Sequence, residues 1–458
     1  MIFTSPVFVL FFLAVFFGTL AIQIFSNERV KYIFLLIASY FFYGWWDWRF
    51  CFLLLFVTLM SYVTAMNSRR KFAYIIGVAI PLIVLGIFKY CNFFLDSLAS
   101  LTGREFLSLQ IILPVGISFY TFQALSYVID VHRGKIPVER DFVKLALYIS
   151  FFPQLVAGPI VRASDFLPQL NESGRKITLQ NFTIGVQIIA MGFFKKIVLA
   201  DHISVFVDDV FRVPVAFHWA TIILAVVSYS LQIYFDFSGY SDIATGCAKC
   251  LGYDFVRNFN LPYISRSVTE FWRRWHISLS GWLRDYLYIP IGGNRLGKFR
   301  QLVNIMITML LGGLWHGANW TFVFWGGLNG LALCLEKIFS RKKSEPGIFV
   351  TFGFISFTWI FFRAESFGKA WQVITGIFTL QDGISQPFFW SFFAIVILVI
   401  SELAAIVKSR RENSSVVTGF CPIMNLDTIT GLTTFFVFVG IILGLAFTGE
   451  NPFVYFQF

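Results

Sequence analysis

The 458-residue chain is 57% hydrophobic and 13% charged, and 59 of its residues are Phe. A typical globular chain carries about 25% charged residues, so this composition leaves too little polar surface to cover a water-soluble particle. It excludes a cytosolic globule, a disordered scaffold and a disulfide-stapled secreted domain. The sequence therefore indicates a polytopic membrane protein.

Apolar segments follow one another along the whole chain. A spanning helix needs about 20 mostly apolar residues, and candidate segments lie at 2–25, 31–47, 50–66, 72–88, 111–131, 142–160, 180–200, 217–235, 301–318, 320–339, 348–362, 388–407 and 431–448. Because some are short or interrupted, we expect roughly 10 to 12 spans plus buried or re-entrant helices. The segments lack the alternation of a barrel strand. The predicted fold is all-α, a polytopic transmembrane helical bundle.

The net charge of +11 is carried mostly by short loops between the apolar segments. Basic loops at 28–31, 68–71 and 132–135 follow the first, third and fifth segments, and 341–343 and 408–411 carry two later basic clusters. This arrangement favours membrane topology over nucleic-acid binding as the reason for the charge. We expect the first three loops on one cytoplasmic face, with the N-terminus outside.

Polar residues gather in a single stretch of the chain. No linker separates soluble domains, so 1–458 is treated as a single integral membrane domain. Its composition changes at about 229–330, where polar and charged residues interleave with Trp and Tyr. Ionisable groups at membrane depth are costly and usually face a cavity or a bundle interior. This polar block is therefore the expected place of any chemistry.

Two of the five histidines, His276 and His316, lie in the polar block. His316 follows paired glycines, which allow backbone or a ligand to approach closely. An uncharged imidazole in a low-dielectric cavity suits a general base near neutral pH. The alternative for His316 is a hydrogen-bonded packing histidine. His276 lies 40 residues upstream, and the spacing does not show whether the two meet.

Cations also concentrate in the polar block. Between 266 and 300, seven Arg or Lys residues stand against Glu270 and Asp285. This surplus suits an anionic ligand, either the phosphates of a nucleotide thiol carrier or anionic lipid headgroups. Cys247 and Cys250 have metal-ligand spacing, but no second Cys or His pair lies nearby, so we predict neither a metal site nor a bound cofactor. Serine-hydrolase, zinc-protease, P-loop and Rossmann motifs are missing.

Several motifs together resemble the membrane-bound O-acyltransferases. The discriminating ones are Phe271-Trp272-Arg273-Arg274-Trp275-His276 and Trp315-His316-Gly317, within a similar block from Tyr234 to Trp325. Supporting matches lie at 113–123, 152–160 and 455–458. The likeness spans most of the chain. It is similar in particular to the bacterial branch that O-acetylates exported polysaccharides, as in alginate acetylation, with peptidoglycan O-acetyltransferases as relatives.

The resemblance implies a tunnel enclosed by helices, which acetyl-CoA enters from the cytoplasm as acyl-donor substrate. His316 would match the family's active-site histidine, the base that deprotonates an attacking hydroxyl, and His276 would polarise the thioester carbonyl or orient the acyl group. For the oxyanion donor, His276 and the backbone amides near Gly312 and Gly313 are candidates. Further candidates for donor or substrate binding are Arg273, Arg274, Trp275, Trp315, Asp236 and Tyr240.

The resemblance also implies a partner, because the chain has no periplasmic domain to handle a polymer. This partner would be a membrane-anchored periplasmic protein with an SGNH-hydrolase-like domain that passes the acetyl group to the polysaccharide. The chain would lie among the lipids of the bacterial inner membrane and would bind no nucleic acid. Two alternatives stay open: D-alanyl transfer to teichoic acid from a carrier-protein thioester, and a non-catalytic transporter.

Overall fold

A computed structural model describes residues 1–25, 27–104, 109–156, 158–172, 175–339, 346–411 and 424–449, with the backbone alone at 401–411. The chain divides into an N-terminal unit, Met1–Ile189 with Tyr240–Val256, and a C-terminal unit, taken from Ala190–Gly239 and Arg257–Phe458. Four sequence features lie outside the described residues: Ala157 of the motif at 152–160, the basic cluster 341–343, the terminal motif 455–458 and Cys421, one of the six cysteines of the chain. The side chains of the basic cluster 408–411 also lie outside them.

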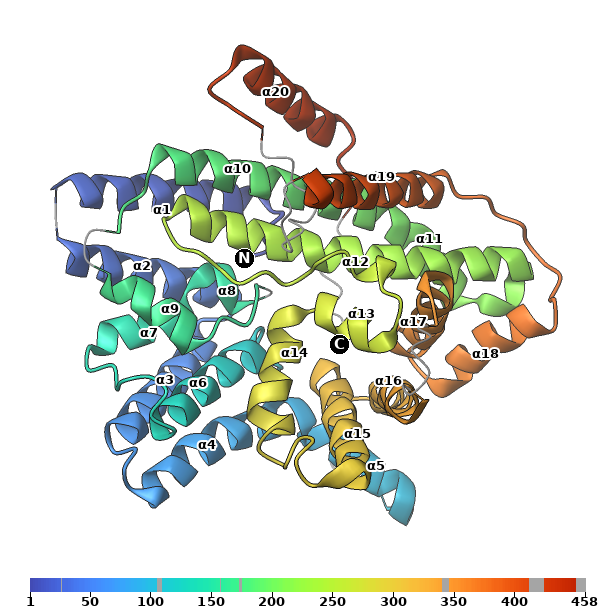
Figure 1. Ribbon diagram of the computed structural model, residues 1–458, viewed down its shortest axis with the longest axis horizontal. Helices are drawn as coiled ribbons and strands as arrows, with labels where there is room; N and C mark the ends of the chain where they lie inside the picture. The colour runs from blue at the N-terminus through green and yellow to red at the C-terminus, as the bar shows by residue number, and fades with distance from the viewer. Residues whose placement is uncertain are drawn as a thin grey trace. The chain divides into compact units, whose positions relative to one another are not determined.

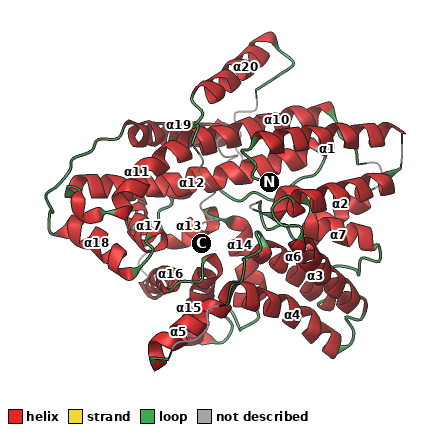
Figure 2. Ribbon diagram, turned by 180° about the vertical axis from the view of Figure 1, so that it is seen from behind, coloured by secondary structure: helices red, strands yellow, loops and turns green. Residues whose placement is uncertain are grey.

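Helices build both units, and the described part of the chain contains no β-strand (Figures 1 and 2). The N-terminal unit contains α1 (Pro6–Phe25), α2 (Glu28–Gly44), α3 (Arg49–Met66), α4 (Lys71–Leu85), η1 (Gly86–Tyr90), α5 (Cys91–Thr102), α6 (Ile117–His132), α7 (Phe142–Ser150), α8 (Phe152–Leu155) and α9 (Ala163–Asn171). Two helices, α10 (Leu179–Phe193) and α12 (Trp219–Cys250), belong partly to each unit. The predicted all-α fold is therefore confirmed.

The remaining helices belong to the C-terminal unit. They are η2 (Phe194–Ala200), α11 (Asp201–Arg212), η3 (Pro214–Ala216), η4 (Pro262–Ile264), α13 (Val268–Arg274), α14 (Ile277–Leu283), η5 (Arg284–Tyr288), α15 (Gly297–His316), α16 (Trp320–Phe339), α17 (Ile348–Arg363), α18 (Phe367–Phe378), α19 (Phe389–Arg411) and α20 (Ile429–Gly444). The predicted polar block thus contains most of α12 and all of the short helices α13 and α14, and ends within α16.

Six helical stretches of the described residues are long and apolar enough to cross a membrane. They are Pro6–Phe25, Arg49–Met66, Lys71–Thr102, Leu179–Arg212, Trp219–Cys250 and Trp320–Phe339, and Ile348–Arg363, Phe389–Ile400 and Ile429–Gly444 are shorter apolar helices. Among the other predicted segments, those at 111–131 and 142–160 differ in structure from a single straight span. Helix α6 is buried from Ile117 to Val131, as a core helix would be, and the segment at 142–160 breaks at Phe151 between α7 and α8.

Two basic loops of the N-terminal unit meet at one of its ends. The Nδ1 atom of His132 lies 2.9 Å from the carbonyl oxygen of Ser68. This contact joins the loop at 68–71 to the loop at 132–135. Lys144, which follows the loop at 132–135 in the chain, lies over the ring of Tyr32, 5.8 Å from the ring centroid. Tyr32 follows directly on the loop at 28–31. The loops at 68–71 and 132–135 therefore lie at the same end of the unit, and the charge rule assigns that end to the cytoplasm. That the loop at 28–31 shares this face stays a prediction.

Helices α15 and α16 form a tight pair in the C-terminal unit (Figures 1 and 2). A Cβ atom on Gly313 would overlap the carbonyl oxygen of Phe322 and lie 3.2 Å from the Cα atom of Gly326. Small residues allow helix backbones to approach in this way within membranes. The crossing fixes the last turn of α15, where the ring of His316 lies 5.1 Å from the ring of Trp325.

We predict that Gly313→Ala destabilises the folded protein by about 1–3 kcal/mol, because overpacking forces the two backbones apart. The matched control is Gly353→Ala in α17, where an added Cβ meets nothing within 4 Å and alanine is the better helix former. Thermal unfolding in detergent should show a lower midpoint for Gly313→Ala alone. Equal midpoints for the two variants would contradict the close crossing.

Candidate active site

Two buried histidines lie together in the C-terminal unit. The ring centroids of His276 and His316 are 6.4 Å apart, and the two residues are 0% and 5% exposed. His276 joins α13 to α14, whereas His316 ends α15. The ring of Trp315 lies 6.0 Å from His276 and 5.0 Å from His316. The fold therefore brings together the two histidines that the sequence leaves 40 residues apart.

The backbone at His276 is held in an unusual conformation. Its φ of 43° lies in the left-handed region, which costs a residue with a Cβ atom roughly 1–2 kcal/mol. Asn258 holds this turn in place, because its carbonyl oxygen accepts the N–H of Ile277 at 2.9 Å and its Oδ1 accepts the hydroxyl of Ser278 at 2.8 Å. Such strain persists where neighbouring groups fix it, often at functional sites.

Asn258 also determines which nitrogen of His276 carries the proton. The backbone N–H of Ser278 donates to Oδ1 of Asn258 at 3.4 Å, so Oδ1 is an acceptor, and Nδ1 of His276, 3.0 Å away, is the donor to it. Burial lowers the pKa of His276 to about 3, which keeps the ring neutral at physiological pH. Its Nε2 therefore retains a lone pair, and no described residue hydrogen-bonds to it.

Aromatic rings surround His316. The rings of Trp325 and Phe362 meet the imidazole edge-on at centroid distances of 5.1 and 5.3 Å. Trp359 stacks on Trp325 at 5.4 Å and extends this wall onto α17. Such a wall excludes water, which strengthens electrostatic interactions inside the site and prevents hydrolysis of a reactive substrate.

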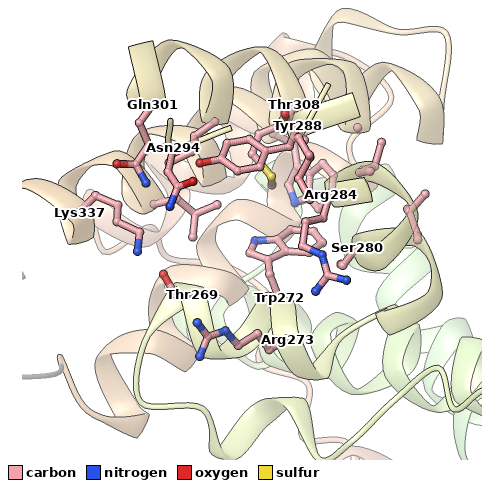
Figure 3. Close-up of a pocket in the computed structure, with 18 of the residues that line it drawn as sticks. Thr269, Trp272, Arg273, Ser280, Arg284, Tyr288, Asn294, Gln301, Thr308 and Lys337 are labelled. Carbon is pink, nitrogen blue, oxygen red and sulfur yellow. The ribbon is translucent and has the colours of Figure 1, made fainter. Parts of the chain in front are cut away.

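A cavity of about 460 Å³ reaches His316 from the surface of the C-terminal unit (Figure 3). It lies between α13, α14, η5, α15 and α16. Its lining residues are Thr269, Trp272, Arg273, Leu279, Ser280, Leu283, Arg284, Tyr288, Ile289, Asn294, Gln301, Ile305, Thr308, Met309, Gly312, His316, Trp325, Leu333 and Lys337. The volume is within the range of small-molecule sites in proteins.

The cavity differs in polarity between its surface and its buried part. Arg273, Arg284 and Lys337 are exposed, and Figure 3 shows them extending from different elements around Trp272. The lining contains no acidic residue, although Arg284 pairs with Asp285 at 2.7 Å. An anionic group suits the cationic surface part, and an uncharged group suits the buried part beside the histidine.

Two polar side chains of helix α16 hold α13 beside the cavity. The carboxylate of Glu336 accepts the backbone N–H groups of Val268 and Thr269 at 2.6 and 2.9 Å. This is the end of α13 that favours negative charge. The Oδ1 of Asn329 accepts the indole N–H of Trp272 at 3.3 Å. These contacts fix the helix that brings two of the lining residues, an aromatic and a cationic one, to the cavity.

Arg274 and Trp275, both predicted as binding residues, do not line this cavity. Arg274 pairs with Glu270 at 2.8 Å and donates to the carbonyl oxygen of Asn260 at 3.1 Å. It therefore braces the loop that carries the Asn258 amide. Trp275 is fully buried and stacks on Phe271 at 5.5 Å. The structure thus places both residues in the support of α13.

Asp236 and Tyr240 lie one turn apart on α12 but belong to different units. The ammonium group of Lys196 lies 2.7 Å from a carboxylate oxygen of Asp236 and 2.7 Å from one of Asp201. This buried charge cluster ties α12 to η2 and α11 within the C-terminal unit. The ring of Tyr240 stacks on Phe3 at 5.7 Å in the N-terminal unit.

Of the predicted site residues, Arg273 and His316 line the cavity. Trp315 and His276 lie beside His316.

The structure argues against both candidate oxyanion donors. Nδ1 of His276 already donates to Asn258, and Nε2 carries no proton in the neutral ring. Gly312 and Gly313 lie inside α15, where each backbone N–H bonds to the carbonyl four residues earlier. Gly312 does line the cavity, but its contribution there is the space left by its missing side chain.

Sequence reasoning misses three residues that shape the site: Asn258, Glu336 and Lys337. Lys337 has the pattern of a lysine that snorkels from the end of an apolar helix, so nothing in its surroundings marks it as a cavity residue. Glu336 offers a stronger signal, because a carboxylate in an apolar helix usually faces a protein partner. Asn258 lies in an irregular loop whose path the sequence does not define.

Comparison with known proteins identifies the chain's relatives. The profile of the membrane-bound O-acyltransferase (MBOAT) family matches residues 137–346. The chain is 43% identical to the probable alginate O-acetylase of Pseudomonas aeruginosa, in an alignment that covers 83% of this chain and 75% of that protein. It is 38% identical to the probable alginate O-acetylase of Pseudomonas putida over the full length of both chains. A peptidoglycan O-acetyltransferase of Helicobacter pylori is 35% identical over 84% of this chain and 81% of its own.

These findings confirm the resemblance that the Trp-His-Gly and Trp-Arg-Arg-Trp-His motifs indicate, and its bacterial branch. They agree with the helical, multi-pass membrane architecture. The protein is therefore an acyltransferase, and the alternative of a non-catalytic transporter is not retained. The chain belongs to the membrane-bound O-acyltransferase family.

Proposed function

We propose that this acyltransferase takes an acetyl group from cytoplasmic acetyl-CoA and delivers it across the membrane for O-acetylation of an exported polysaccharide, through a periplasmic SGNH-type partner. The observation that carries the donor assignment is the cavity with cations at the surface and His316 at its buried part. Coenzyme A has the matching polarity, because its phosphates are anionic and its thioester end is uncharged. The sequence just beyond Lys337 carries the basic cluster 341–343, which the charge rule assigns to the cytoplasm.

The chemistry follows from the surroundings of the two histidines. His316 accepts the proton of a hydroxyl group of the acceptor while the oxygen of that hydroxyl forms a bond to the acetyl carbon. The carbon–sulfur bond of the thioester then breaks, and the proton passes to the departing thiolate. The neutral His276 contributes an acceptor nitrogen, Nε2, which accepts a hydrogen bond from a second hydroxyl or amide N–H of the acceptor and so orients it. Arg273, Arg284 and Lys337 bind the phosphates and hold the thioester in place.

The acceptor class is supported by the relatives. Those that match most of this chain are named alginate O-acetylase and peptidoglycan O-acetyltransferase, and both names refer to polymers outside the cytoplasm. D-alanyl transfer from a carrier-protein thioester is the competing chemistry.

Supplying membrane vesicles with either radiolabelled acetyl-CoA or a radiolabelled D-alanyl carrier protein separates acetyl transfer from D-alanyl transfer. We expect label to reach the external fraction only from acetyl-CoA.

His316→Ala should abolish acetyl transfer in these vesicles, lowering the rate by about 10²–10⁴-fold, the range that a general base contributes. The protein should still insert, because the substitution leaves the glycine crossing of α15 and α16 intact. The matched control is His218→Ala, a histidine of the same unit that does not line the cavity. Transfer by His316→Ala at the rate of His218→Ala would refute the base assignment.

Arg273→Gln and Lys337→Gln should each raise the KM for acetyl-CoA by about ten-fold with little change in kcat, as expected when one charge-assisted contact to a phosphate is lost. The KM for acetyl-pantetheine, which lacks the nucleotide phosphates, should not change. Arg300→Gln removes an exposed charge of α15 outside the cavity and serves as the control. An equal KM increase in all three variants would point to general electrostatic attraction instead.

Folding stability should depend on pH through His276. Burial lowers its pKa from the usual 6.5 to about 3, so the unfolded chain binds more protons between these pH values and stability falls as pH drops below 6.5. From pH 7.5 to pH 5 the parent protein should lose about 2 kcal/mol more than His276→Asn does. Unfolding by SDS titration in mixed micelles measures this difference. Identical pH dependence in the parent and in His276→Asn would mean that His276 is not buried as a neutral ring.

A further inference from the structure

A basic cleft lies in the N-terminal unit, apart from the residues proposed for catalysis. It has a volume of about 700 Å³ and is formed by the turn between α3 and α4 and the turn between α6 and α7. Its lining residues are Ser68, Arg69, Val131, His132, Gly134, Lys135, Ile136, Pro137 and Val138. The acyl-transfer chemistry uses none of them.

The cleft is strongly cationic. Its two turns, 67–71 and 130–138, carry five Arg or Lys residues and one acidic residue, Asp130. Asp130 is buried and lies 3.3 Å from the ammonium group of Lys135, which is itself half exposed. Arg69 is exposed at the opposite turn. Two cations therefore face the same cleft from separate turns, an arrangement that suits an anion with several oxygen atoms.

The shape of the cleft is fixed by contacts between its two turns. The ring of His132 stacks on Tyr74 with a centroid distance of 3.9 Å and an interplanar angle of 13°. Its Nδ1 donates to the carbonyl oxygen of Ser68 at 2.9 Å, because a carbonyl oxygen can only accept. Gly134 has a φ of 68°, and a Cβ atom there would meet nothing within 4 Å. The turn therefore leaves open space between fixed side chains.

Apolar side chains lie next to the cleft and face outward. Met66 at the end of α3 is 42% exposed, and Phe72 and Ile75 at the start of α4 are 74% and 50% exposed. Both helices belong to stretches long and apolar enough to span the membrane, so these side chains face lipid. The cleft thus lies where headgroups meet acyl chains, on the face that the basic loops assign to the cytoplasm. Clusters of Lys and Arg at this depth attract anionic lipids.

We propose that the basic cleft binds the phosphate of an anionic phospholipid headgroup, whose acyl chains lie along the exposed apolar side chains of α3 and α4. Arg69 and Lys135 contact the phosphate oxygens from opposite turns. A free phosphate or a nucleotide offers the same anionic oxygens but gains nothing from Met66, Phe72 and Ile75. The flanking apolar surface is therefore the reason to assign the phosphate to a lipid.

The test measures binding of fluorescent phosphatidylglycerol to the full-length protein in a neutral detergent. Each cation near an anionic headgroup contributes about five-fold in affinity, so Arg69→Gln should weaken binding about five-fold and Arg69→Gln with Lys135→Gln about 25-fold. The charge-conserving pair Arg69→Lys with Lys135→Arg should keep the parent's affinity. Because Arg69→Gln leaves the Asp130–Lys135 pair intact, its result does not depend on how the double variant folds.

The matched control removes two exposed cations of the N-terminal unit outside the cleft, by Arg29→Gln with Lys176→Gln. Neither residue lines the cleft, so the control should bind phosphatidylglycerol as the parent does. Equal weakening in the control and the cleft variants would overturn the site, because net charge alone would explain the binding. Competition by inorganic phosphate as effective as that by unlabelled phosphatidylglycerol would overturn the lipid assignment. Competition by phosphatidylcholine as effective as that by unlabelled phosphatidylglycerol would overturn the assignment to an anionic lipid.

Discussion

Burial of a neutral imidazole is the constraint on which the site depends. A buried polar group left without a hydrogen bond costs about 1–3 kcal/mol, and His276 avoids part of that cost only because Asn258 accepts the Nδ1 proton. Asn258 in turn needs its loop held, and Arg274 does this by donating to the carbonyl oxygen of Asn260. The left-handed backbone at His276 is tolerated within this network. One amide thus fixes the orientation and the tautomer of a histidine that lies 6.4 Å from His316, and burial keeps that histidine neutral.

Helix packing places His316 beside the cavity. Gly313 allows α15 to touch α16, and this contact places His316 against Trp325 at one end of the cavity. The carboxylate of Glu336, farther along α16, anchors α13 beside the same cavity. A single helix therefore positions an aromatic wall, a cationic residue and the start of the motif-bearing helix. A cavity with an apolar interior and a cationic surface follows from this arrangement.

Much of the fold could be predicted from the sequence, because hydropathy reports directly on which segments can be helical in a membrane. Most residues of the predicted apolar segments are helical, and a hydrogen bond joins the basic loops at 68–71 and 132–135. What hydropathy could not show is the break at Phe151 or the burial of α6, since both depend on tertiary contacts. Of the predicted binding residues, Arg273 lines the cavity, but Trp275 packs in the support of α13. The residue types in a motif indicate chemistry. The direction of the backbone decides which side chain reaches the cavity and which neighbour enters the core, and this direction depends on tertiary contacts such as that of Glu336 with α13.

The proposed function requires that the acyl donor occupies the cavity that ends at His316. A structure of the full-length protein with a non-hydrolysable thioether analogue of acetyl-CoA tests it most directly. We expect the phosphates of the analogue near Arg273, Arg284 and Lys337, and its acetyl group beside His316 and His276. An analogue bound elsewhere on the protein, with this cavity empty, would contradict the claim.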